Sequence, residues 1–462
     1  MKTTLQKRFL LSLLIAGLSG LLANQAMAQT FTILHPFSTG SDGGKPKARL
    51  LLSGNTLYGT AYGGGFTSYG TVFRLNTDGG GYQTLYYFTN GNNGGLPQAG
   101  LILSGDTLYG TTTEGVSSNY YGTVFAIKTN GVGFTNIYSF KGGTDGSLPR
   151  ADLILSGNTL YGTTKQAGGM NLGSVFRINT DGGSFTNLSS FASFDTAHGS
   201  HGGIPLAGLV LSGNTLYGTA YAGGSTSFGT VYSVNTDGTG FENIYYFTNG
   251  IDGAYPVAPL VLSGDTLYGT AETGGSAGNG TSFSGYGTVF KVGTNGLGFK
   301  TLYSFTNGVD GAYPQAGLVL SGNTLYGTAD TGGSSGAGTV FKVNTDGSGF
   351  LSLYSFTNGA DGANPQAGLV LSSNTLYGTT SSGNGGYGTV FSLSLSAVGP
   401  PAPQLTILRS GTNMILSWSA TGFILQAATN LHSPVVWSTV ASGLNSATNP
   451  ISGAQKFYRL TQ

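Results

Sequence analysis

The sequence predicts an all-β protein, a seven-bladed β-propeller closed by its N-terminal strand, plus a small C-terminal β-domain. Three observations predict this architecture. The phrase LSGNTLYGT returns with small changes, and its tyrosine falls at Tyr58, Tyr109, Tyr161, Tyr217, Tyr268, Tyr326 and Tyr377. A second phrase, GTVF or a close variant, follows each copy and begins at Gly70, Gly122, Gly173, Gly229, Gly287, Gly338 and Gly388. The third observation is a displaced last strand, found at the start of the repeats.

Each repeat reads as four short strands, which the sixth copy shows well. Residues 317–320 (GLVL) and 324–328 (TLYGT) flank a Ser-Gly-Asn turn, and a Gly/Ser-rich loop follows. Residues 338–344 (GTVFKVN) and 350–356 (FLSLYSF) are rich in β-branched and aromatic residues and flank a turn at Asp346-Gly347. Four antiparallel strands in a unit of roughly 50 residues indicate propeller blades. The structural alternative is a β-solenoid, but its coils are usually shorter and fit hairpin turns poorly.

The two ends of the repeat array predict a closed ring. The seventh copy stops after its third strand, at residues 388–395, and its missing fourth strand lies instead at residues 31–37 (FTILHPF). This segment continues into Asp42-Gly43 and Pro46, matching the passage that follows the other fourth strands. A linear array of repeats is not expected to begin with a fourth strand. A closed ring is, because the N-terminal strand then completes the seventh blade and removes the exposed edges.

The recurring phrases LSGNTLYGTT, GTVFKVNTDG and LYSFTNGxDGAxP resemble the gloeo/verruco-type tandem repeat of bacterial exported proteins. The resemblance covers about four-fifths of the chain and is specific, because long phrases recur. It implies extracellular placement, usually through a C-terminal sorting or anchoring segment. It implies no known activity.

The first 28 residues read as a secretory signal peptide. Lys2, Lys7 and Arg8 form a positive n-region, an apolar stretch follows, and Ala26-Met27-Ala28 fits the cleavage motif. We therefore expect cleavage after Ala28, a secreted or cell-surface protein, and no membrane insertion after cleavage. The predicted order is a signal peptide at 1–28, the propeller at 29–397, a Pro-rich linker at 398–404 and a small β-sandwich-like domain at 405–462.

Composition narrows the classes of function. Charged residues make up 8% of the chain and the net charge is +1 without a Lys/Arg cluster, which argues against nucleic acid as a partner. The chain has no cysteine, which excludes disulfides, thiolate metal sites and a cysteine nucleophile. It has 26 Tyr and 26 Phe among 82 Gly, and such a share of aromatic residues indicates an ordered chain with many turns.

The C-terminal domain reads as short strands at residues 405–408, 414–418, 423–427, 437–440 and 456–460. Both tryptophans of the protein, Trp418 and Trp437, lie in it. Its sequence looks like the small C-terminal β-sandwich modules of bacterial exported proteins. Its role is either surface attachment and spacing or a plain structural cap.

Candidate site residues are the exceptions to the repeat, because residues shared by all blades are structural. The position four residues after the repeat tyrosine differs from copy to copy. In the seven copies it is occupied by Tyr62, Thr113, Lys165, Tyr221, Glu272, Asp330 and Ser381. We expect these positions to gather on one face of the propeller, together with the variable Gly/Ser/Tyr loops. The candidate ligand-binding residues are Tyr62, Glu114, Lys165, Tyr221, Glu272 and Asp330. At any single one of these positions, the alternative to a ligand-binding residue is an ordinary solvated loop residue.

The remaining titratable residues favour structural roles. Eleven aspartates recur in turns or between blades, where Asp forms turns, and a single carboxylate per blade makes no calcium ligand cluster. Asp195, His198 and His201 have the chemistry of transition-metal ligands, but a Gly-rich loop holds ligands poorly. His35 and His432 look incidental. We predict no metal, no cofactor and no catalytic residue.

The sequence favours an exported, non-catalytic binding or surface protein that recognises a glycan or another exported protein. Tyr, Asn, Ser and Gly dominate its loops, and such loops make adaptable binding surfaces. The alternative is a polysaccharide hydrolase or lyase that uses Glu272, Asp330 or Glu114. A third possibility is a structural component of the cell envelope. No GxSxG, HExxH or GxxxxGK[ST] motif occurs.

Deleting residues 29–37 should lower the melting temperature sharply, because the seventh blade would keep three strands and the ring an open edge. Thermal unfolding followed by circular dichroism measures the effect. An unchanged melt would contradict ring closure by this strand.

Overall fold

The computed structural model describes residues 29–38, 40–89, 93–115, 121–168, 172–191, 202–276 and 285–395, and C-terminal segments at 406–410, 413–417, 424–428, 438–441, 446–450 and 457–461. Thr30–Ser394 forms one compact unit, and the C-terminal segments belong to a second one. The predicted signal peptide, the linker at 398–404, both tryptophans and the group of Asp195, His198 and His201 lie outside the described residues.

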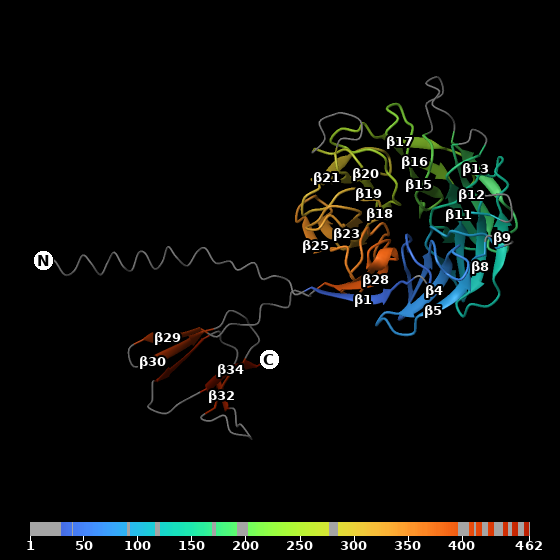
Figure 1. The fold of residues 1–462 in the computed structure, drawn as a ribbon. Helices are drawn as coiled ribbons and strands as arrows, with labels where there is room; N and C mark the ends of the chain where they lie inside the picture. The colour runs from blue at the N-terminus through green and yellow to red at the C-terminus, as the bar shows by residue number, and fades with distance from the viewer. Residues whose placement is uncertain are drawn as a thin grey trace. The chain divides into compact units, whose positions relative to one another are not determined.

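The strands of Thr30–Ser394 pair into seven four-stranded antiparallel sheets, counted over the described part of the chain. We name them blades I to VII in the order in which the chain enters them. Blade I is β2–β5, and each later blade takes the next four strands, up to blade VII, which is β26–β28 with β1. Figure 1 shows the sheets arranged around a ring, with the strands of a blade following one another outward from the middle, as β18 to β21 do. The prediction of an all-β propeller is confirmed.

The strands recur at the same places in every repeat. The first strand has three residues in each blade: β2 Leu51–Ser53, β6 Ile102–Ser104, β10 Ile154–Ser156, β14 Val210–Ser212, β18 Val261–Ser263, β22 Val319–Ser321 and β26 Val370–Ser372. The second strand carries the TLYGT phrase: β3 Thr56–Ala61, β7 Thr107–Thr112, β11 Thr159–Thr164, β15 Thr215–Ala220, β19 Thr266–Ala271, β23 Thr324–Ala329 and β27 Thr375–Thr380. In blade VII the 3₁₀ turn η1 (Asn384–Gly386) follows it.

The two outer strands of the blades carry more aromatic residues than the two inner strands. The third strands are β4 Thr71–Asn76, β8 Thr123–Lys128, β12 Ser174–Asn179, β16 Thr230–Asn235, β20 Thr288–Gly293, β24 Thr339–Asn344 and β28 Thr389–Ser394. The fourth strands are β5 Gln83–Tyr87, β9 Thr135–Ser139, β13 Thr186–Ser190, β17 Glu242–Tyr246, β21 Lys300–Ser304, β25 Leu351–Ser355 and, from the other end of the chain, β1 Thr30–Pro36. Among the described residues no helix is long and apolar enough to cross a membrane.

The strand β1 closes the ring. It pairs antiparallel with β28 from Thr30 opposite Ser394 to Pro36 opposite Thr389. Phe31 stacks on Tyr354 of blade VI at a ring distance of 4.1 Å. On the other side of blade VII, Phe37 is buried in one cluster with residues of blade I. The first strand of the propeller therefore joins its last blade to both neighbours.

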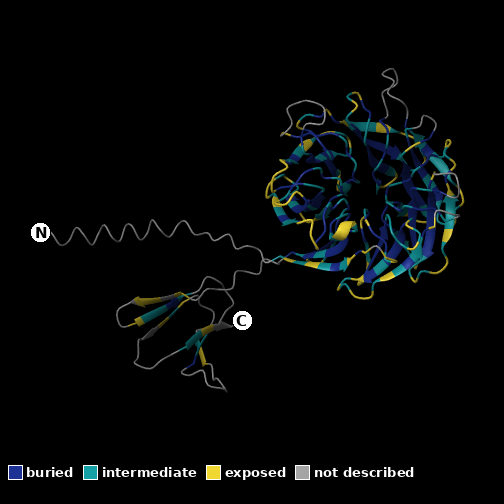
Figure 2. Cartoon of the chain, viewed as in Figure 1, coloured by how far each residue is buried: buried dark blue, intermediate teal, exposed yellow. Residues whose placement is uncertain are grey.

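The core of the propeller lies between adjacent blades, because each cluster of its buried residues combines residues of two neighbouring blades. Figure 2 shows that most of the buried residues belong to the blades of the ring. Each blade packs the aromatic ring of its third strand, phenylalanine in six blades and Tyr232 in blade IV, against the glycine of its second strand, and a Cβ on Gly59 would come within 2.5 Å of the Phe73 ring. Glycine is required there because the ring fills the space of any side chain. Outer strands add a stacked ring pair between blades, such as Tyr245 on Phe299 at 3.9 Å.

The recurring aspartate between blades is a turn former, as the sequence predicts. Asp252 accepts hydrogen bonds from Tyr245 Oη, the Thr248 amide, Thr248 Oγ1 and the Gly250 amide at 2.7–3.1 Å. These four donors occupy the carboxylate, so it holds the passage between two blades together. Over the described ranges, no group of three His, Asp, Glu or Cys side chains is placed to hold a metal ion.

His35 is not incidental, and here the sequence interpretation needs correction. The imidazole takes the place of the blade tyrosine: it stacks on Tyr82 at 3.7 Å and its Nε2 lies 3.2 Å from the Asp42 carboxylate. Burial lowers the pKa of His35, and the charge of Asp42 opposes this shift only in part. The strand β1 thus carries His35 where other fourth strands carry a tyrosine that contacts the passage aspartate and a ring of the next blade.

The C-terminal unit contains two three-stranded sheets in its described segments. One is β29 (Thr406–Ser410), β30 (Asn413–Ser417) and β33 (Ser446–Pro450), and the other is β32 (Ser438–Ala441), β31 (Ile424–Ala428) and β34 (Phe457–Thr461). Leu416 of the first sheet and Leu425 of the second are buried in one cluster. The sequence indicated five of these strands and missed β33.

Replacing Tyr232 with Phe should stabilise the propeller. Tyr232 is fully buried on β16, and within the described structure its hydroxyl has no hydrogen-bond partner. The other blades carry Phe73, Phe125, Phe176, Phe290, Phe341 and Phe391 at this position. Tyr232→Phe should raise the free energy of unfolding by about 1–3 kcal/mol, the usual cost of an unpaired buried polar group.

Chemical denaturation measures this change, and Phe290→Tyr on β20 is the matched control, since it introduces the same hydroxyl into the next blade. The free energy of unfolding of Phe290→Tyr should be lower than that of the parent by a similar amount. A Tyr232→Phe protein less stable than the parent would show that the hydroxyl is satisfied.

Replacing His35 with Tyr should remove part of the acid sensitivity of the fold. Because burial holds the pKa of folded His35 below its ordinary value of 6.5, the unfolded chain binds the proton more readily. The free energy of unfolding therefore falls as the pH drops below about 6.5. In His35→Tyr this contribution is absent, because a tyrosine hydroxyl is neutral at every acidic pH and binds no proton on unfolding.

The measurement is the difference in melting temperature between parent and variant from pH 8 to pH 5, which should widen as the pH falls. Tyr245→His is the matched control in blade IV and should add acid sensitivity. A constant difference across this range would rule out the proposed titration.

Candidate functional site

One residue in each passage between blades has an uncommon backbone conformation. The residue before the passage proline has positive φ in every blade: Lys45 (55°), Leu96 (55°), Leu148 (56°), Ile204 (59°), Tyr255 (58°), Tyr313 (55°) and Asn364 (54°). Positive φ is rare outside glycine and strained for a β-branched residue such as Ile204. Such a conformation persists only where surrounding contacts fix it.

Those contacts are backbone hydrogen bonds to two blades. The amide of Tyr255 donates to the Phe228 carbonyl of blade IV at 2.8 Å, and its carbonyl accepts from the Glu272 amide of blade V at 3.2 Å. The same pair of bonds recurs in all seven passages. The residues whose amides are held in this way are the predicted ring: Tyr62, Thr113, Lys165, Tyr221, Glu272, Asp330 and Ser381. These positions are therefore fixed relative to the passages beside them.

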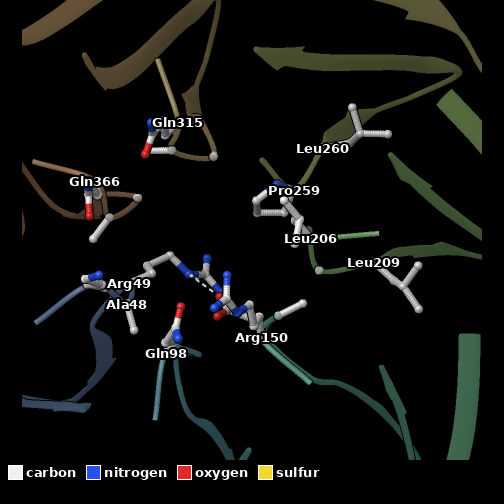
Figure 3. A pocket seen from close by; sticks show the side chains of 18 of the residues that line it. Ala48, Arg49, Gln98, Arg150, Leu206, Leu209, Pro259, Leu260, Gln315 and Gln366 are labelled. Atoms are coloured by element: carbon white, nitrogen blue, oxygen red, sulfur yellow. Dashed lines mark ion pairs between the residues drawn. The ribbon is translucent and has the colours of Figure 1, made fainter. Parts of the chain in front are cut away.

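The residue after the passage proline faces the middle of the ring. This position holds Lys47, Gln98, Arg150, Leu206, Val257, Gln315 and Gln366, and all seven line a cavity of about 550 Å³. We call this cavity the channel mouth. A second cavity of about 300 Å³ shares several of these residues and continues along the first strands. Figure 3 shows Arg49 and Arg150 extending from different blades toward the middle of this second cavity.

The structure brings most of the predicted site residues together. Lys165, Tyr221 and Glu272 line the channel mouth directly. Asp330 lies close enough for its charge to act on both Glu272 and Lys47. Tyr62 lies beneath Lys47, whose Nζ is 4.5 Å from the ring centre.

Glu114 lies apart from this group. It is one position further along the chain than the predicted ring, where its backbone pairs with Gly95. It is not among the residues that line either cavity.

One side of the mouth is cationic. Burial lowers the pKa of Lys47, and the charges of Arg150 and Lys45 lower it further, while Asp330 opposes the shift. Burial also lowers the pKa of Lys165, again with a contribution from Arg150. The Arg150 Nε atom is buried and has no hydrogen-bond partner within the described residues. Blades I and III thus place like charges near one another with little water around them.

The opposite side is acidic. Burial raises the pKa of Glu272, whose Oε1 accepts a hydrogen bond from Gln315 Nε2 at 2.8 Å, and the charge of Asp330 raises it further. Burial also raises the pKa of Asp330, although Asn364, Gln366 and Lys47 oppose the shift. In the described structure the buried Oδ1 atom of Asp330 has no hydrogen-bond partner. Both carboxyls are therefore poorly solvated, unlike ordinary loop residues.

Deeper in the channel one carboxylate is already engaged. Asp152 accepts a hydrogen bond from the Gly100 amide at 2.6 Å, and its Oδ2 lies 3.6 Å from Arg49 Nε (Figure 3). These two contacts connect Asp152 of blade III with Arg49 of blade I and Gly100 of blade II, three consecutive blades. They leave the cations at the mouth without this carboxylate as a counter-ion.

Tyrosine rings provide flat surface at the mouth. Tyr221 stacks on Tyr255 of the next blade with 4.8 Å between ring centres. Burial raises the pKa of Tyr221, with smaller contributions from Glu272 and Tyr255. Both hydroxyls therefore stay protonated at neutral pH and present donors beside the acidic side.

Sequence reasoning missed the residues after the proline. Lys47, Gln98, Arg150, Gln315 and Gln366 lie in segments that read as turns between blades. A signal was present, because this position varies from blade to blade while the proline before it recurs in all seven. Aligning the repeats on that proline would have revealed a second ring of exceptions.

Comparison with known proteins supports the fold. A family model described as the Gloeobacter/Verrucomicrobia repeat matches residues 20–199 and 283–409. No curated protein matches the chain in sequence.

Solved structures similar to this one are propellers of diverse function. The GH74 enzyme of Niastella koreensis has a TM-score of 0.51 and 15% identity, over 84% of this chain and 59% of that one. A puromycin-hydrolyzing peptidase of Mycobacterium tuberculosis has a TM-score of 0.47 and 12% identity, over 84% and 61%. An oligogalacturonate lyase in complex with manganese has a TM-score of 0.46 and 11% identity, over 80% and 94%. At these identities the likeness concerns the fold alone.

Proposed function

Since the chain belongs to the Gloeobacter/Verrucomicrobia repeat family, we propose that it is an exported, non-catalytic binding protein that holds a glycan at the channel mouth. Export rests on the signal-peptide pattern of residues 1–28. The mouth combines a cavity of about 550 Å³ with side chains converging from several blades, as is usual for ligand sites.

One observation carries this proposal. Two charged groups at the mouth are partly desolvated yet incompletely paired within the described structure: Asp330 through Oδ1 and Arg150 through Nε. A buried polar atom without a partner costs free energy, so such atoms point to a partner that completes them. A sugar suits both, because its hydroxyl groups donate to a carboxylate and accept from a guanidinium.

The surrounding residues favour a glycan over another exported protein. Tyr62, beneath Lys47, and Tyr221, stacked on Tyr255, bring aromatic rings with a hydroxyl at one end to the mouth, and such rings suit the mixed surface of a sugar ring. Gln98, Gln315 and Gln366 add amide groups that donate and accept. These groups line a concave mouth rather than a broad flat area. A standard protein interface buries about 800 Å² per partner, so the mouth suits a smaller ligand than a folded protein.

The carboxyl pair favours binding over catalysis. General acid–base chemistry with two carboxyls needs environments that drive their pKa values apart, so that one donates a proton while the other accepts it. Here burial raises the pKa of both Glu272 and Asp330. A polysaccharide hydrolase or lyase that uses these carboxylates is the alternative, and the binding experiment also tests it.

The protein should bind glycans on a printed array, and Glu272→Gln and Asp330→Asn should each weaken binding roughly tenfold, because charged hydrogen bonds contribute about 1.5–3 kcal/mol. Isothermal titration calorimetry with the best glycan measures the dissociation constants. Glu114→Gln is the matched control and should bind as the parent does, because Glu114 lies outside both cavities and, unlike Asp330, is not among the charges that act on Glu272 or Lys47.

Incubation with the same glycan, followed by product analysis, separates binding from catalysis. Products that form with the parent and disappear with Glu272→Gln would establish the hydrolase or lyase alternative. Failure to bind any glycan would overturn the proposed function.

A further inference from the structure

The charges at the channel mouth are sorted by blade. Lys47 comes from blade I, and Arg150 and Lys165 come from blade III. Glu272 comes from blade V and Asp330 from blade VI, and around the closed ring blade VI is two blades from blade I. Gln98 of blade II lies between the two cationic blades and also lines the mouth. The cations therefore form one group, which we call the cationic arc: Lys47, Arg150 and Lys165.

The cationic arc lacks a full complement of counter-ions. Of the described carboxylates near it, Asp152 is engaged by Arg49 and the Gly100 amide, and the charge of Asp330 acts on Lys47. Arg150, whose Nε has no partner in the described residues, is the member of the arc whose charge acts on both lysines. Like charges held close together in a partly buried cavity repel one another, and an anion bound among them removes this cost.

We propose that the cationic arc is a subsite for the anionic group of an acidic glycan, a carboxylate or a sulfate ester. This inference rests on the proposed function, because it names the class of glycan that the same mouth binds. Arg150 supplies a planar guanidinium suited to a carboxylate or a sulfate, and Lys47 and Lys165 supply point charges on either side. The sugar ring then extends toward Tyr62 and Tyr221.

The acidic side of the mouth argues against a simple polyanion as the ligand. Glu272 and Asp330 repel a ligand that carries negative charge at every position, such as a polyphosphate. An acidic sugar instead presents one anionic group together with several hydroxyl donors. Its anionic group fits the cationic arc while its hydroxyls face the carboxyls. The glutamines at 98, 315 and 366 accept either kind of group.

The test uses matched ligands that differ only in charge. Oligogalacturonates and their fully methyl-esterified forms share one backbone, so any difference in affinity reports the carboxylate. A sulfated oligosaccharide and its desulfated form make the same comparison for a sulfate ester. We expect an acidic form to bind about tenfold or more tightly than its neutral partner at low salt, with the difference shrinking as salt rises.

The variants use residues that the propeller already tolerates. Arg150→Gln places in blade III the residue that blades II, VI and VII carry at the same position. It should abolish the preference for the acidic form while leaving the melting temperature close to that of the parent. Lys342→Gln removes one positive charge from β24, outside the mouth, and should leave the preference intact.

The outcomes separate the two proposals. Equal affinity for the acidic and neutral forms, or a preference that survives in Arg150→Gln, overturns the anionic subsite and leaves glycan binding in place. Binding of neither form of either pair, nor of any arrayed glycan, overturns both. Tighter binding of an acidic peptide than of any acidic glycan, abolished by Arg150→Gln, assigns the arc to a protein partner and overturns the glycan assignment.

Discussion

The pairing of β1 with β28 is the constraint on which the rest of the structure depends. It joins residues from the two ends of the propeller and gives blade VII the fourth strand that its own repeat lacks. The chain has no cysteine, so strand pairing and packing alone hold the ring together. Every blade buries its faces against two neighbours, and a ring with one loose blade would expose two such faces to water.

Closure by the first strand also governs how the protein folds. The partners Thr30 and Ser394 are far apart in sequence, and such non-local contacts carry a high cost in chain entropy before they form. Blades I to VI pair only strands that follow one another in sequence. Blade VII is complete only when the first and the last strand of the propeller meet.

Much of this fold was predictable because the repeats are nearly identical. The phrases around Tyr58 and Gly70, and their later copies, contain the strand and turn signals at fixed spacing, and the displaced FTILHPF segment predicted closure. His35 was misjudged because it replaces a tyrosine whose contact with aspartate is visible only in three dimensions. Strand β33 was missed because SATNP combines Asn and Pro with few β-branched residues.

The candidate site was predictable in part, and for a physical reason. Glu272, Lys165 and Tyr221 stand out because they break a repeat at the end of a strand. Lys47 and Arg150 follow a proline in segments with turn composition, and composition says nothing about which way a turn faces. Only the ring geometry shows that this position points to the axis. The partial burial that shifts the pKa values of these groups follows from that geometry too.

The passage residue with positive φ has a consequence for how such a protein diversifies. In every passage it joins two blades through its backbone amide and carbonyl, and these two hydrogen bonds do not depend on which side chain the residue carries. Lys, Leu, Ile, Tyr and Asn all occupy this place in one chain. One backbone joint therefore serves seven passages whose side chains differ. A protein engineer can exchange that side chain in a single blade while the hydrogen bonds between the blades are kept.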